Sequence, residues 1–266
     1  MSGGGNDFLV FEADGHALTE EDRRRLALVC RRGLSVGADG ALFLSPSGGA
    51  RVRLDYFNAD GGLASFCANG TRCAARYAAR RRLVAGDPVV ETGWAAIPAR
   101  VEDGCVTLKL PALDAPGAQV RCFGEGLPPS ATPMRVGVPH LVVFVESDLE
   151  TLAVAKLAPP LRRHPDLPEG ANVNFVKVEP GGRLSLRTYE RGVEAETLAC
   201  GSGVVAAAVV AADKGLVRPP VTCRTRSGAA FRVGFTPGRG TVADASLSGD
   251  AREIFAGELT EEAWQE

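Results

Sequence analysis

Residues 56–73 read YFNADGGLASFCANGTRC and open an alanine-rich helix that is predicted to continue to about Leu83. Residues 186–203 read LRTYERGVEAETLACGSG and lead into a second small-residue helix that is predicted to end near Lys214. In both stretches a strand leads through a polar turn to one cysteine, and small residues follow it at the start of a helix. The chain therefore contains an internal repeat, and its two halves are expected to fold alike.

The repeated cysteines, Cys67 and Cys200, are predicted to lie where each helix begins. The first N–H groups of a helix have no partner within it and carry the positive end of its dipole, so they stabilise a thiolate and bind a carboxylate. Two such helix ends facing one pocket would hold one carboxylate and place a thiol on each side of its α-carbon. This is the geometry of a two-base racemase, in which one thiolate removes the α-proton and the other thiol returns a proton to the opposite face.

The remaining five of the seven cysteines lack this context. A single cysteine is more often a packing residue than a reactive one, because free cysteine is among the most buried residue types. Cys73 lies inside the first helix and is expected to be buried. The others are predicted to be core or strand residues: Cys30, Cys105, Cys122 and Cys223.

Length and charge limit the possible classes of protein. The 266 residues allow one large domain or two smaller ones, and the net charge of −2 gives no indication of nucleic-acid or membrane binding. Residues 1–5 lack the features of a secretory signal, and seven cysteines without regular spacing fit a reducing compartment, so a cytoplasmic location is expected. Residues 204–212 form the longest apolar run, which is too short to span a bilayer. No metal site is predicted, since the sequence has no C-x-x-C pair or histidine cluster.

Short apolar stretches between glycines and prolines predict an α+β fold with many strands and few helices. A helix is expected over residues 19–32, with Thr19 as its N-cap and Asp22 at its third position. A further helix is expected over residues 148–157, a loop over 159–170 and a linker over 111–133. Each half would then wrap its strands around one helix that is apolar on nearly all sides and therefore buried. Strands are predicted at residues 8–12, 41–45, 52–57, 89–92, 97–102, 105–110, 134–138, 141–146, 172–178, 184–189, 221–226, 230–235 and 241–248.

Seven short motifs, taken together, resemble the diaminopimelate epimerase family. Each motif alone is a weak signal, but their order and spacing match the family over nearly the whole chain. The motifs are Gly5-Asn6-Asp7-Phe8, Asn58-Ala59-Asp60-Gly61, Cys67-Ala68-Asn69-Gly70, Pro139-His140, Asn172, Glu190-Arg191-Gly192 and Cys200-Gly201-Ser202-Gly203.

The resemblance implies two similar barrel-like domains, each a curved, mostly antiparallel sheet around a central helix, related by a pseudo-twofold axis. Residues 1–113 would form the first domain, to which residues 249–266 return, and residues 114–248 would form the second. The substrate site would lie in the cleft between them. A homodimer and a cofactor-independent reaction are implied as well.

The same resemblance implies a set of site residues. Cys67 and Cys200 match the catalytic pair, and His140 matches a histidine near the cysteines that could take up or relay a proton. Glu190 is assigned to the catalytic residues as well as to the substrate-binding ones. The backbone at the two helix ends would hold the α-carboxylate of LL- or meso-2,6-diaminopimelate, while the distal ammonium and carboxylate would meet polar side chains, with Arg191 suited to the carboxylate and Glu190 to the ammonium. The implied substrate-binding residues are Asn6, Asn58, Ala68, Asn69, Asn172, Glu190, Arg191, Gly201 and Ser202.

Four departures from the family pattern are visible. Ala68 stands where C-G-N-G has glycine, Val138 replaces an asparagine before Pro-His, and Gly40 replaces a glutamine. The stretch between Glu190 and Cys200 is one residue longer than the commonest spacing. These changes leave the two-thiol chemistry intact and leave the choice of substrate open.

Three alternatives remain open at this point. The chain could racemise another amino acid on the same fold, although proline and hydroxyproline racemase motifs fit it less well. It could be a non-catalytic amino-acid binding protein, which would need no thiols. A pyridoxal-phosphate racemase would need a Schiff-base lysine near a phosphate-binding loop, and none of the four lysines has that setting: Lys109, Lys156, Lys177 and Lys214.

Overall fold

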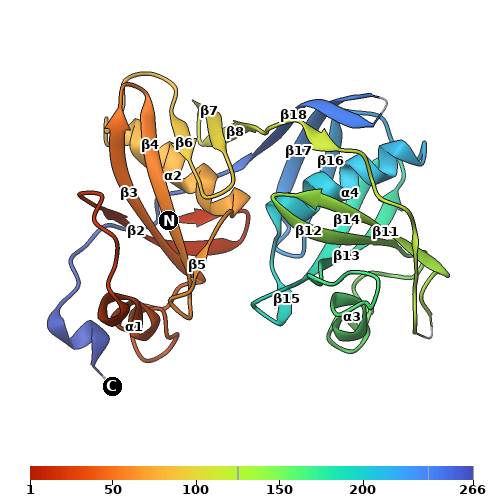
Figure 1. Ribbon diagram of the computed structural model, residues 1–266, viewed down its shortest axis with the longest axis horizontal. Helices are drawn as coiled ribbons and strands as arrows, with labels where there is room; N and C mark the ends of the chain where they lie inside the picture. The colour runs from red at the N-terminus through yellow and green to blue at the C-terminus, as the bar shows by residue number, and fades with distance from the viewer. Residues whose placement is uncertain (125, 239, 266) are drawn as a thin grey trace. The chain divides into compact units, whose positions relative to one another are not determined.

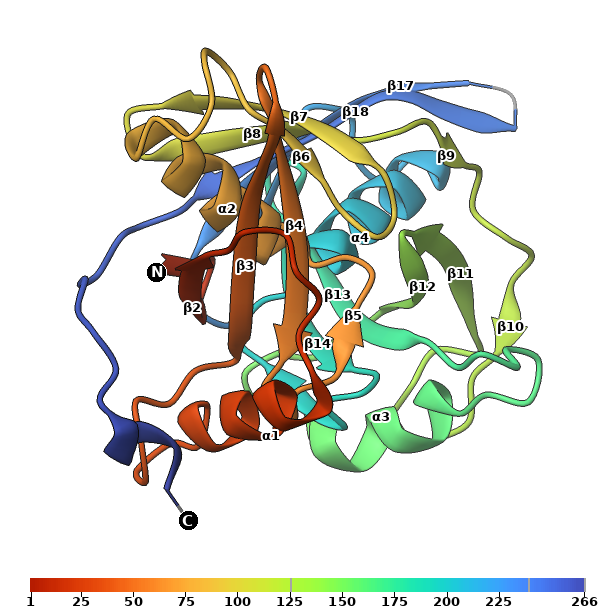
Figure 2. The same ribbon diagram turned by 60° about the vertical axis from the view of Figure 1, so that its left-hand side comes forward.

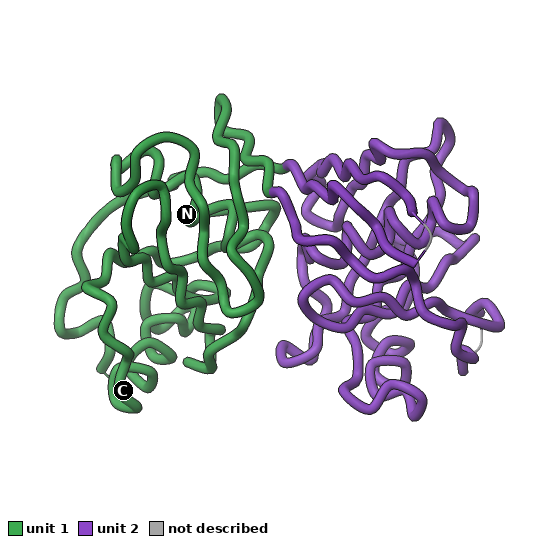
Figure 3. Tube along the Cα trace, turned by 45° about the horizontal axis from the view of Figure 1, so that its top comes forward, with its two compact units in different colours: residues 1–108, 249–266 green, residues 109–248 purple. Residues whose placement is uncertain are grey.

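The computed structural model describes residues 1–124, 126–238 and 240–265; residue 266, the last of the predicted C-terminal return, lies outside them (Figure 1). The chain divides into two compact units (Figure 3). One comprises Met1–Leu108 with Gly249–Glu266, and the other comprises Lys109–Ser248.

Among the residues that the structure describes, the first unit contains a mixed sheet, the α-helices α1 and α2 and a short 3₁₀ helix. Its strand β2 lies parallel to β3, with α1 between them in the chain, and β3 turns back antiparallel into β4. Strand β4 pairs antiparallel with β5 and parallel with β6, which continues antiparallel into β7 and β8. In chain order the elements are β1 (Ser2–Gly3), β2 (Asn6–Glu12), α1 (Glu20–Val29), β3 (Gly40–Gly48), β4 (Arg51–Asn58), β5 (Leu63–Ala64), α2 (Ala68–Arg80), β6 (Val89–Glu91), β7 (Ala96–Glu102), β8 (Cys105–Lys109) and, near the C-terminus, the 3₁₀ helix η1 (Glu261–Trp264).

The second unit repeats this order of elements and pairings. Strand β12 lies parallel to β13, β13 turns back into β14, and β14 pairs antiparallel with β15 and parallel with β16. Strands β17 and β18 follow antiparallel, as β7 and β8 do in the first unit. The elements are β9 (Leu113–Asp114), β10 (Val120–Arg121), β11 (Ser130–Val136), β12 (Val138–Phe144), α3 (Val154–Arg162), β13 (Asn172–Glu179), β14 (Arg183–Glu190), β15 (Ala195–Thr197), α4 (Gly201–Asp213), β16 (Val221–Arg224), β17 (Ala230–Pro237) and β18 (Thr241–Asp250). The predicted α+β class, with a mostly antiparallel mixed sheet and few helices, is confirmed.

The helices that follow the repeated cysteines are the most buried elements of their units. Every residue of α4 from Gly201 to Ala211 is buried, and α2 is buried from Ala68 to Ala75. Helix α2 contacts strands β2, β3, β4, β6 and β7, while α4 contacts β11, β12, β13, β14, β16 and β17. Figure 2 shows α2 passing behind β3 and β4 of its unit. Small side chains permit this close contact between helix and sheet.

The outer helices, α1 and α3, differ in how well the sequence predicts them. Helix α1 has the expected N-cap, since Thr19 and Asp22 form a complete capping box. The prediction for α3 was wrong: the helix covers Val154–Arg162 and includes Pro159 and Pro160, which had been assigned to a loop. Apolar residues spaced along one face of this helix pack into the core. Each proline lacks the N–H that would bond to a carbonyl one turn earlier, but the residues that carry these two carbonyls are exposed.

The predicted linker over residues 111–133 is also partly wrong, because it contains strands. Strand β10 pairs with β11 through Val120 and Ala131, and β9 pairs with β18 through Leu113 and Val242. Short edge strands of this kind carry too few alternating residues to stand out in a sequence rich in proline and glycine.

Gly40 explains one of the departures from the family pattern. It opens β3 opposite Asn58, and a Cβ atom added there would lie 2.3 Å from the carbonyl oxygen of Phe57. A glutamine at this position would therefore require the β3–β4 pair to move apart.

We expect Gly40→Ala to destabilise the protein by about 1–3 kcal/mol, because the new methyl group meets a backbone oxygen that cannot rotate away. Urea denaturation followed by circular dichroism measures the change. Gly257→Ala is the matched control, since no atom lies within 4 Å of the added Cβ. Equal midpoints for the two variants would contradict the steric argument.

Candidate active site

Cys67 is the N-cap residue of α2. Its backbone is extended, with φ −141° and ψ 110°, and its sulfur accepts a hydrogen bond from the N–H of Gly70 at 3.4 Å. The side chain is half-buried. Its carbonyl accepts from both the N–H and the hydroxyl of Thr71. The predicted position of this thiol at a helix N-terminus is therefore what the structure shows.

A chain of polar side chains begins one turn below this thiol. Arg72 donates from Nη2 to Asn69 Oδ1 at 2.8 Å, and Asn69 Nδ2 donates to Asn6 Oδ1 at 2.6 Å. Asn6 Nδ2 in turn donates to the carboxylate of Asp39 at 2.8 Å. Because arginine can only donate and an ionised carboxylate can only accept, both amides are held in one orientation. Asn6 and Asn69, which were predicted to bind substrate, thus support one another.

The outer end of this chain is an ion-pair cluster on the surface. Arg32 bonds to both Asp7 and Asp39. Burial raises the pKa of Asp7, but the hydrogen bonds and charge of Arg32 more than offset this, and the net pKa lies below its usual value. Asp39 therefore has a cation beside it as well as the Asn6 amide.

Arg72 is fully buried. Besides Asn69 it donates to the carbonyl of Ala68 and to the carbonyl of Asp250, both at 3.3 Å. Ala68 and Asn69 are themselves buried in the first turn of α2. Arg72 consequently fixes the two residues whose backbone was predicted to hold the substrate carboxylate.

Cys200 is the N-cap residue of α4, with φ −124° and ψ 106°. Its side chain is only 5% exposed, and its sulfur lies 3.6 Å from the hydroxyl oxygen of Ser202. Gly201 and Ser202 are buried in the first turn of the helix. The second cysteine thus has the same backbone setting as the first and a drier surrounding.

His140, in β12, lies in a buried polar group of the second unit. Asn174 donates from Nδ2 to His140 Nδ1 at 3.3 Å, and the hydroxyl of Thr188 donates to Asn174 Oδ1 at 3.0 Å. Two backbone carbonyls also accept from Asn174 Nδ2, which fixes the amide orientation. With Nδ1 as acceptor, the proton of the neutral ring resides on Nε2, which has no hydrogen-bond partner among the residues that the structure describes.

Burial, together with the charges of Arg191 and Arg135, lowers the pKa of His140 to about 3. The ring is therefore neutral throughout the neutral pH range. It can donate a hydrogen bond from Nε2, and taking up a proton is unfavourable.

The residues predicted for the far end of the substrate lie at the ends of β13 and β14. Asn172 faces His140 in the parallel register of β12 and β13, and its Oδ1 accepts from the backbone N–H of Arg191 at 2.7 Å. The Arg191 side chain donates to the carbonyl of Glu169 at 2.9 Å, and Glu190 accepts from the hydroxyl of Thr197 at 2.6 Å. Asn58 ends β4 in the first unit, as Glu190 ends β14 in the second.

The turn after Glu190 holds these residues in place. Glu194 N–H donates to the carbonyl of Glu190 at 2.8 Å, and the hydroxyl of Tyr189 donates to the carbonyl of Glu194 at 2.6 Å. The carboxylate of Glu194 pairs with Arg162 at 2.7 Å. The ion pair with Arg162 connects this turn to α3.

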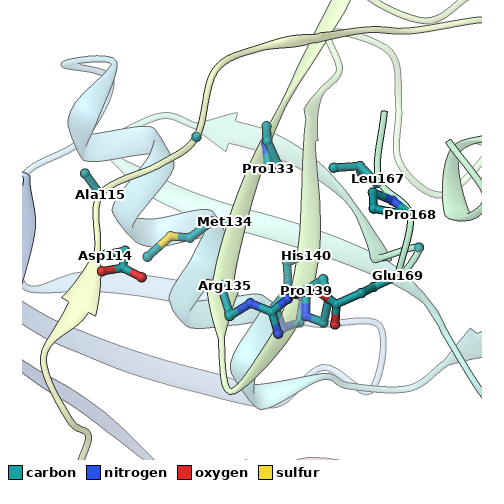
Figure 4. A pocket seen from close by; sticks show the side chains of 12 residues that line it. Asp114, Ala115, Pro133, Met134, Arg135, Pro139, His140, Leu167, Pro168 and Glu169 are labelled. Atoms are coloured by element: carbon teal, nitrogen blue, oxygen red, sulfur yellow. Dashed lines mark hydrogen bonds and ion pairs between the residues drawn. The ribbon is translucent and has the colours of Figure 1, made fainter. Parts of the chain in front are cut away.

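A pocket of about 250 Å³ opens beside His140 in the second unit (Figure 4). Arg135 and Glu169 form an ion pair in its wall, and Arg191 holds the backbone of Glu169 from outside. The lining residues are Asp114, Ala115, Gly117, Pro133, Met134, Arg135, Pro139, His140, Leu167, Pro168, Glu169 and Gly170. His140 is thus the point at which this pocket meets the predicted site residues of the unit.

Asn6 and Asn69 are hydrogen-bonded in the first unit, and Asn172 lies opposite His140 and accepts from Arg191 in the second. The structure adds four supporting residues to these. Asp39 and Arg72 complete the chain around Asn6 and Asn69, while Asn174 and Thr188 orient His140. The sequence gives two signals for these roles. Arg72 follows Cys67 by five residues, and Asn174 alternates with Asn172 along one strand.

Within residues 1–124, 126–238 and 240–265, no helix is long and apolar enough to cross a membrane. The same residues contain no cluster of three or more histidine, cysteine or acidic side chains that could hold a metal ion.

Comparison with solved structures identifies the class of fold. A probable proline racemase from Agrobacterium radiobacter superposes with a TM-score of 0.73 at 16% identity, covering 98% of this chain and 91% of its own. A putative phenazine biosynthesis PhzC/PhzF protein from Clostridium difficile superposes with a TM-score of 0.64 at 12% identity, covering 94% and 91%. The architecture is therefore the one shared by these racemase and PhzF structures, the diaminopimelate epimerase-like fold.

Sequence comparison identifies the family within that class. The diaminopimelate epimerase family model matches residues 1–95 and 133–231. Diaminopimelate epimerases from Methanothrix thermoacetophila and Archaeoglobus fulgidus are each 38% identical, over 100% and 97% of this chain and 96% and 94% of their own lengths. The enzyme from Aquifex aeolicus is 35% identical over 98% of the chain and 97% of its own length. The chain belongs to the diaminopimelate epimerase family and is an isomerase of the kind that acts without pyridoxal phosphate.

The depressed pKa of His140 predicts how stability depends on pH. Unfolding exposes the ring, which then binds a proton below about pH 6.5, whereas the folded protein does not until about pH 3. The unfolded state binds more protons in this window, so this group makes stability fall as the pH falls from 6.5 to 3. The slope is up to about 1.4 kcal/mol per pH unit.

His140→Gln should therefore weaken the acid dependence of the unfolding free energy between pH 6.5 and 4, whatever its effect at neutral pH. Urea midpoints for wild type and variant at several pH values provide the measurement. Parallel curves would show that His140 has a normal pKa in the folded protein.

Proposed function

We propose that this protein interconverts LL-2,6-diaminopimelate and meso-2,6-diaminopimelate by moving one proton at the α-carbon between two thiols. The observation that carries the proposal is the repeated cysteine, Cys67 and Cys200, each the N-cap of a buried helix. The names of the relatives at 35–38% identity over the whole chain supply the substrate. Catalysis then serves the synthesis of lysine.

The proton transfer proceeds in one direction as follows. A thiolate at Cys67 or Cys200 takes the α-proton, and the electron pair of the broken C–H bond spreads into the adjacent carboxylate. The other cysteine gives its thiol proton to the opposite face of the carbon, so the two thiols have exchanged roles at the end. This reaction requires both sulfurs to reach one α-carbon from opposite sides.

The first turns of α2 and α4 suit the developing charge. The N–H groups of Ala68 and Asn69, and those of Gly201 and Ser202, lie in the first turns of these helices, where a carboxylate gains hydrogen bonds and the favourable end of the dipole. As charge moves from the α-carbon to the carboxylate oxygens, these interactions strengthen, and the barrier falls.

His140 contributes to this site as a neutral hydrogen-bond donor. Its Nδ1 is occupied by Asn174, and its Nε2 carries the proton. A neutral imidazole held in one tautomer can orient a polar group of the substrate or a thiol without competing for the transferred proton.

Polar side chains at the strand ends would recognise the distal half of the substrate. Arg191 is the residue we assign to the distal carboxylate, with Asn172 fixing its backbone, and Glu190 is assigned to the distal ammonium. Asn6 and Asn58 are the corresponding contributions from the first unit.

The two epimerase-like domains, which we divide at residues 113 and 114 and at residues 248 and 249, would then correspond to the two compact units, whose first boundary lies at residues 108 and 109. We further propose a homodimer that resides in the cytoplasm, in line with the family.

Deuterium incorporation tests the reaction and the role of both thiols. In heavy water with reductant and without pyridoxal phosphate, the wild type should introduce deuterium at the α-carbon of LL-diaminopimelate with inversion to the meso isomer. Cys67→Ser and Cys200→Ser should each lose inversion by a factor of about 10³ or more, because a serine hydroxyl is too weak an acid to replace a thiol. Cys105→Ser, at an exposed cysteine outside both groups, is the control. Normal inversion in either of the first two variants would rule out the two-thiol mechanism.

Arg191→Gln should lower kcat/KM for diaminopimelate by about 10- to 150-fold, as expected for a lost charge-assisted hydrogen bond worth about 1.5–3 kcal/mol. Arg163→Gln removes a neighbouring arginine that pairs with Glu194 on the surface and serves as the matched control. If an analogue without the distal carboxylate distinguishes wild type from Arg191→Gln as strongly as diaminopimelate does, Arg191 does not bind that carboxylate.

A further inference from the structure

The fifth residue after each repeated cysteine differs sharply between the two units. In α2 it is Arg72 and in α4 it is Val205, and both side chains are fully buried. The same helix position thus holds a cation in one unit and an aliphatic side chain in the other. The fold itself does not require a charge there.

The hydrogen bonds of Arg72 to Asn69, Ala68 and Asp250 all end on uncharged oxygens. They satisfy N–H groups of the guanidinium, and its positive charge interacts with the sulfurs of Cys73 and Cys67 and with the carboxylate of Asp250. Burial lowers the pKa of Arg72, while thiolates at Cys73 and Cys67 raise it. Arginine is so weak an acid that it stays protonated in proteins.

The attraction between Arg72 and a thiolate is mutual, so a sulfur that favours the charged arginine is itself made more acidic by it. Two sulfurs on α2 are affected. Cys73 is fully buried, and burial raises its pKa to about 12 even with Arg72 beside it, so this side chain remains a thiol. Cys67 is half-buried, so a negative charge on its sulfur loses less hydration than one on the sulfur of Cys73.

Two further differences act in the same direction. The sulfur of Cys67 accepts a helix N–H, from Gly70, at 3.4 Å, whereas the sulfur of Cys200 lies beside a hydroxyl group. Cys200 is also more deeply buried than Cys67, and burial disfavours the charged form of a thiol.

Most of the other titratable groups near α2 have partners of their own, and Asp250 also interacts electrostatically with Arg72. Asp250 lies at the end of β18, but its carboxylate accepts from Gly4 N–H and pairs with Arg252. On β2, Asp7 bonds to Arg32 and Glu12 accepts from Tyr77. The amino group of residue 1 donates to the carbonyl of Phe8, and Cys105 lies on β8.

We propose that the enzyme waits for substrate with Cys67 as the thiolate and Cys200 as the thiol, and that Arg72 is the positioning residue that sets this asymmetry. The inference rests on the two-cysteine function proposed above. Cys67 is then the base that removes the α-proton from one of the two isomers when it binds to the resting enzyme. To convert the other isomer, the resting enzyme has to move a proton from Cys200 before the reaction begins.

Alkylation by iodoacetamide as a function of pH, without substrate, tests the proposal. Cys200→Ser leaves Cys67 to be followed, and Cys67→Ser leaves Cys200, with peptide mapping by mass spectrometry to separate each from the other cysteines. The readout is the pH midpoint of alkylation, because the rate alone would also report the greater exposure of Cys67. Arg72→Gln, which keeps amide donors without the charge, and Arg72→Lys, which keeps the charge, are then introduced into both backgrounds.

We expect the midpoint of Cys67 to lie at least about one pH unit below that of Cys200, equivalent to a tenfold larger thiolate fraction. Arg72→Gln should raise the midpoint of Cys67 by about one unit and leave that of Cys200 in place, and Arg72→Lys should restore most of the shift. Arg76→Gln, one turn further along α2, is the matched control and should change neither midpoint. A role of Arg72 in packing alone would move the melting temperature and leave both midpoints unchanged.

Equal midpoints for the two cysteines in the unmodified Arg72 background, or a midpoint of Cys67 that Arg72→Gln does not shift, would overturn the proposal. The first comparison stands even if the Arg72 variants fail to fold. Since alkylation needs no substrate, these outcomes are independent of the deuterium experiment, which alone decides whether diaminopimelate is epimerised.

Discussion

The site in each unit depends on the close contact between a helix N-terminus and the strands below it. A helix can present its first N–H groups to a ligand only if no large side chain covers them, and both α2 and α4 begin with small residues after the cysteine. The third of these is a glycine in each case. A Cβ added to Gly70 would lie 3.0 Å from Leu42, and one added to Gly203 would lie 2.2 Å from Asn174 Oδ1. Even a methyl group at either position would therefore require the Leu42 or Asn174 side chain beneath the helix end to move.

These two contacts also show how the repeat has been used differently in its two copies. Leu42 and Asn174 occupy matching positions in the two units. Leu42 lies opposite Tyr56 and Asn174 lies opposite Thr188, and each of these partners is the third residue from the end of its strand. In the second unit this position is polar and orients His140 from beneath α4. In the first unit it is apolar, and polar support comes from within α2 itself, through Arg72. The two units have the same order of elements. The polar side chain that supports the site lies on a strand in the second unit and on the helix in the first.

The sequence predicts the features that repeat and misses those that belong to one copy. The cysteines, the buried helices and most strands follow from motifs that occur twice, and the matching pairings of β2 to β8 and β12 to β18 agree with that interpretation. The helix expected over residues 148–157 was placed too early in the chain, because Pro159 and Pro160 are ordinarily helix breakers and only the packing of α3 (Val154–Arg162) shows that the fold accepts them. Asn174 and Asp39 could not be assigned either, because their roles arise from contacts between residues more than 30 positions apart.

Arg72 shows that a buried contact can affect the chemistry of the site as well as its packing. Removing a guanidinium from water costs several kcal/mol, and hydrogen bonds to neutral oxygens offset only part of this cost. Val205 shows that the corresponding position of α4 is filled by an aliphatic side chain in an otherwise similar helix. A charge retained at such a cost, one turn below a helix-capping thiol, changes the energy of that thiol's anion more than it changes the packing. The two halves of the chain can therefore share one fold and still hold thiols of different acidity, which a reaction that begins with one thiolate and one thiol requires.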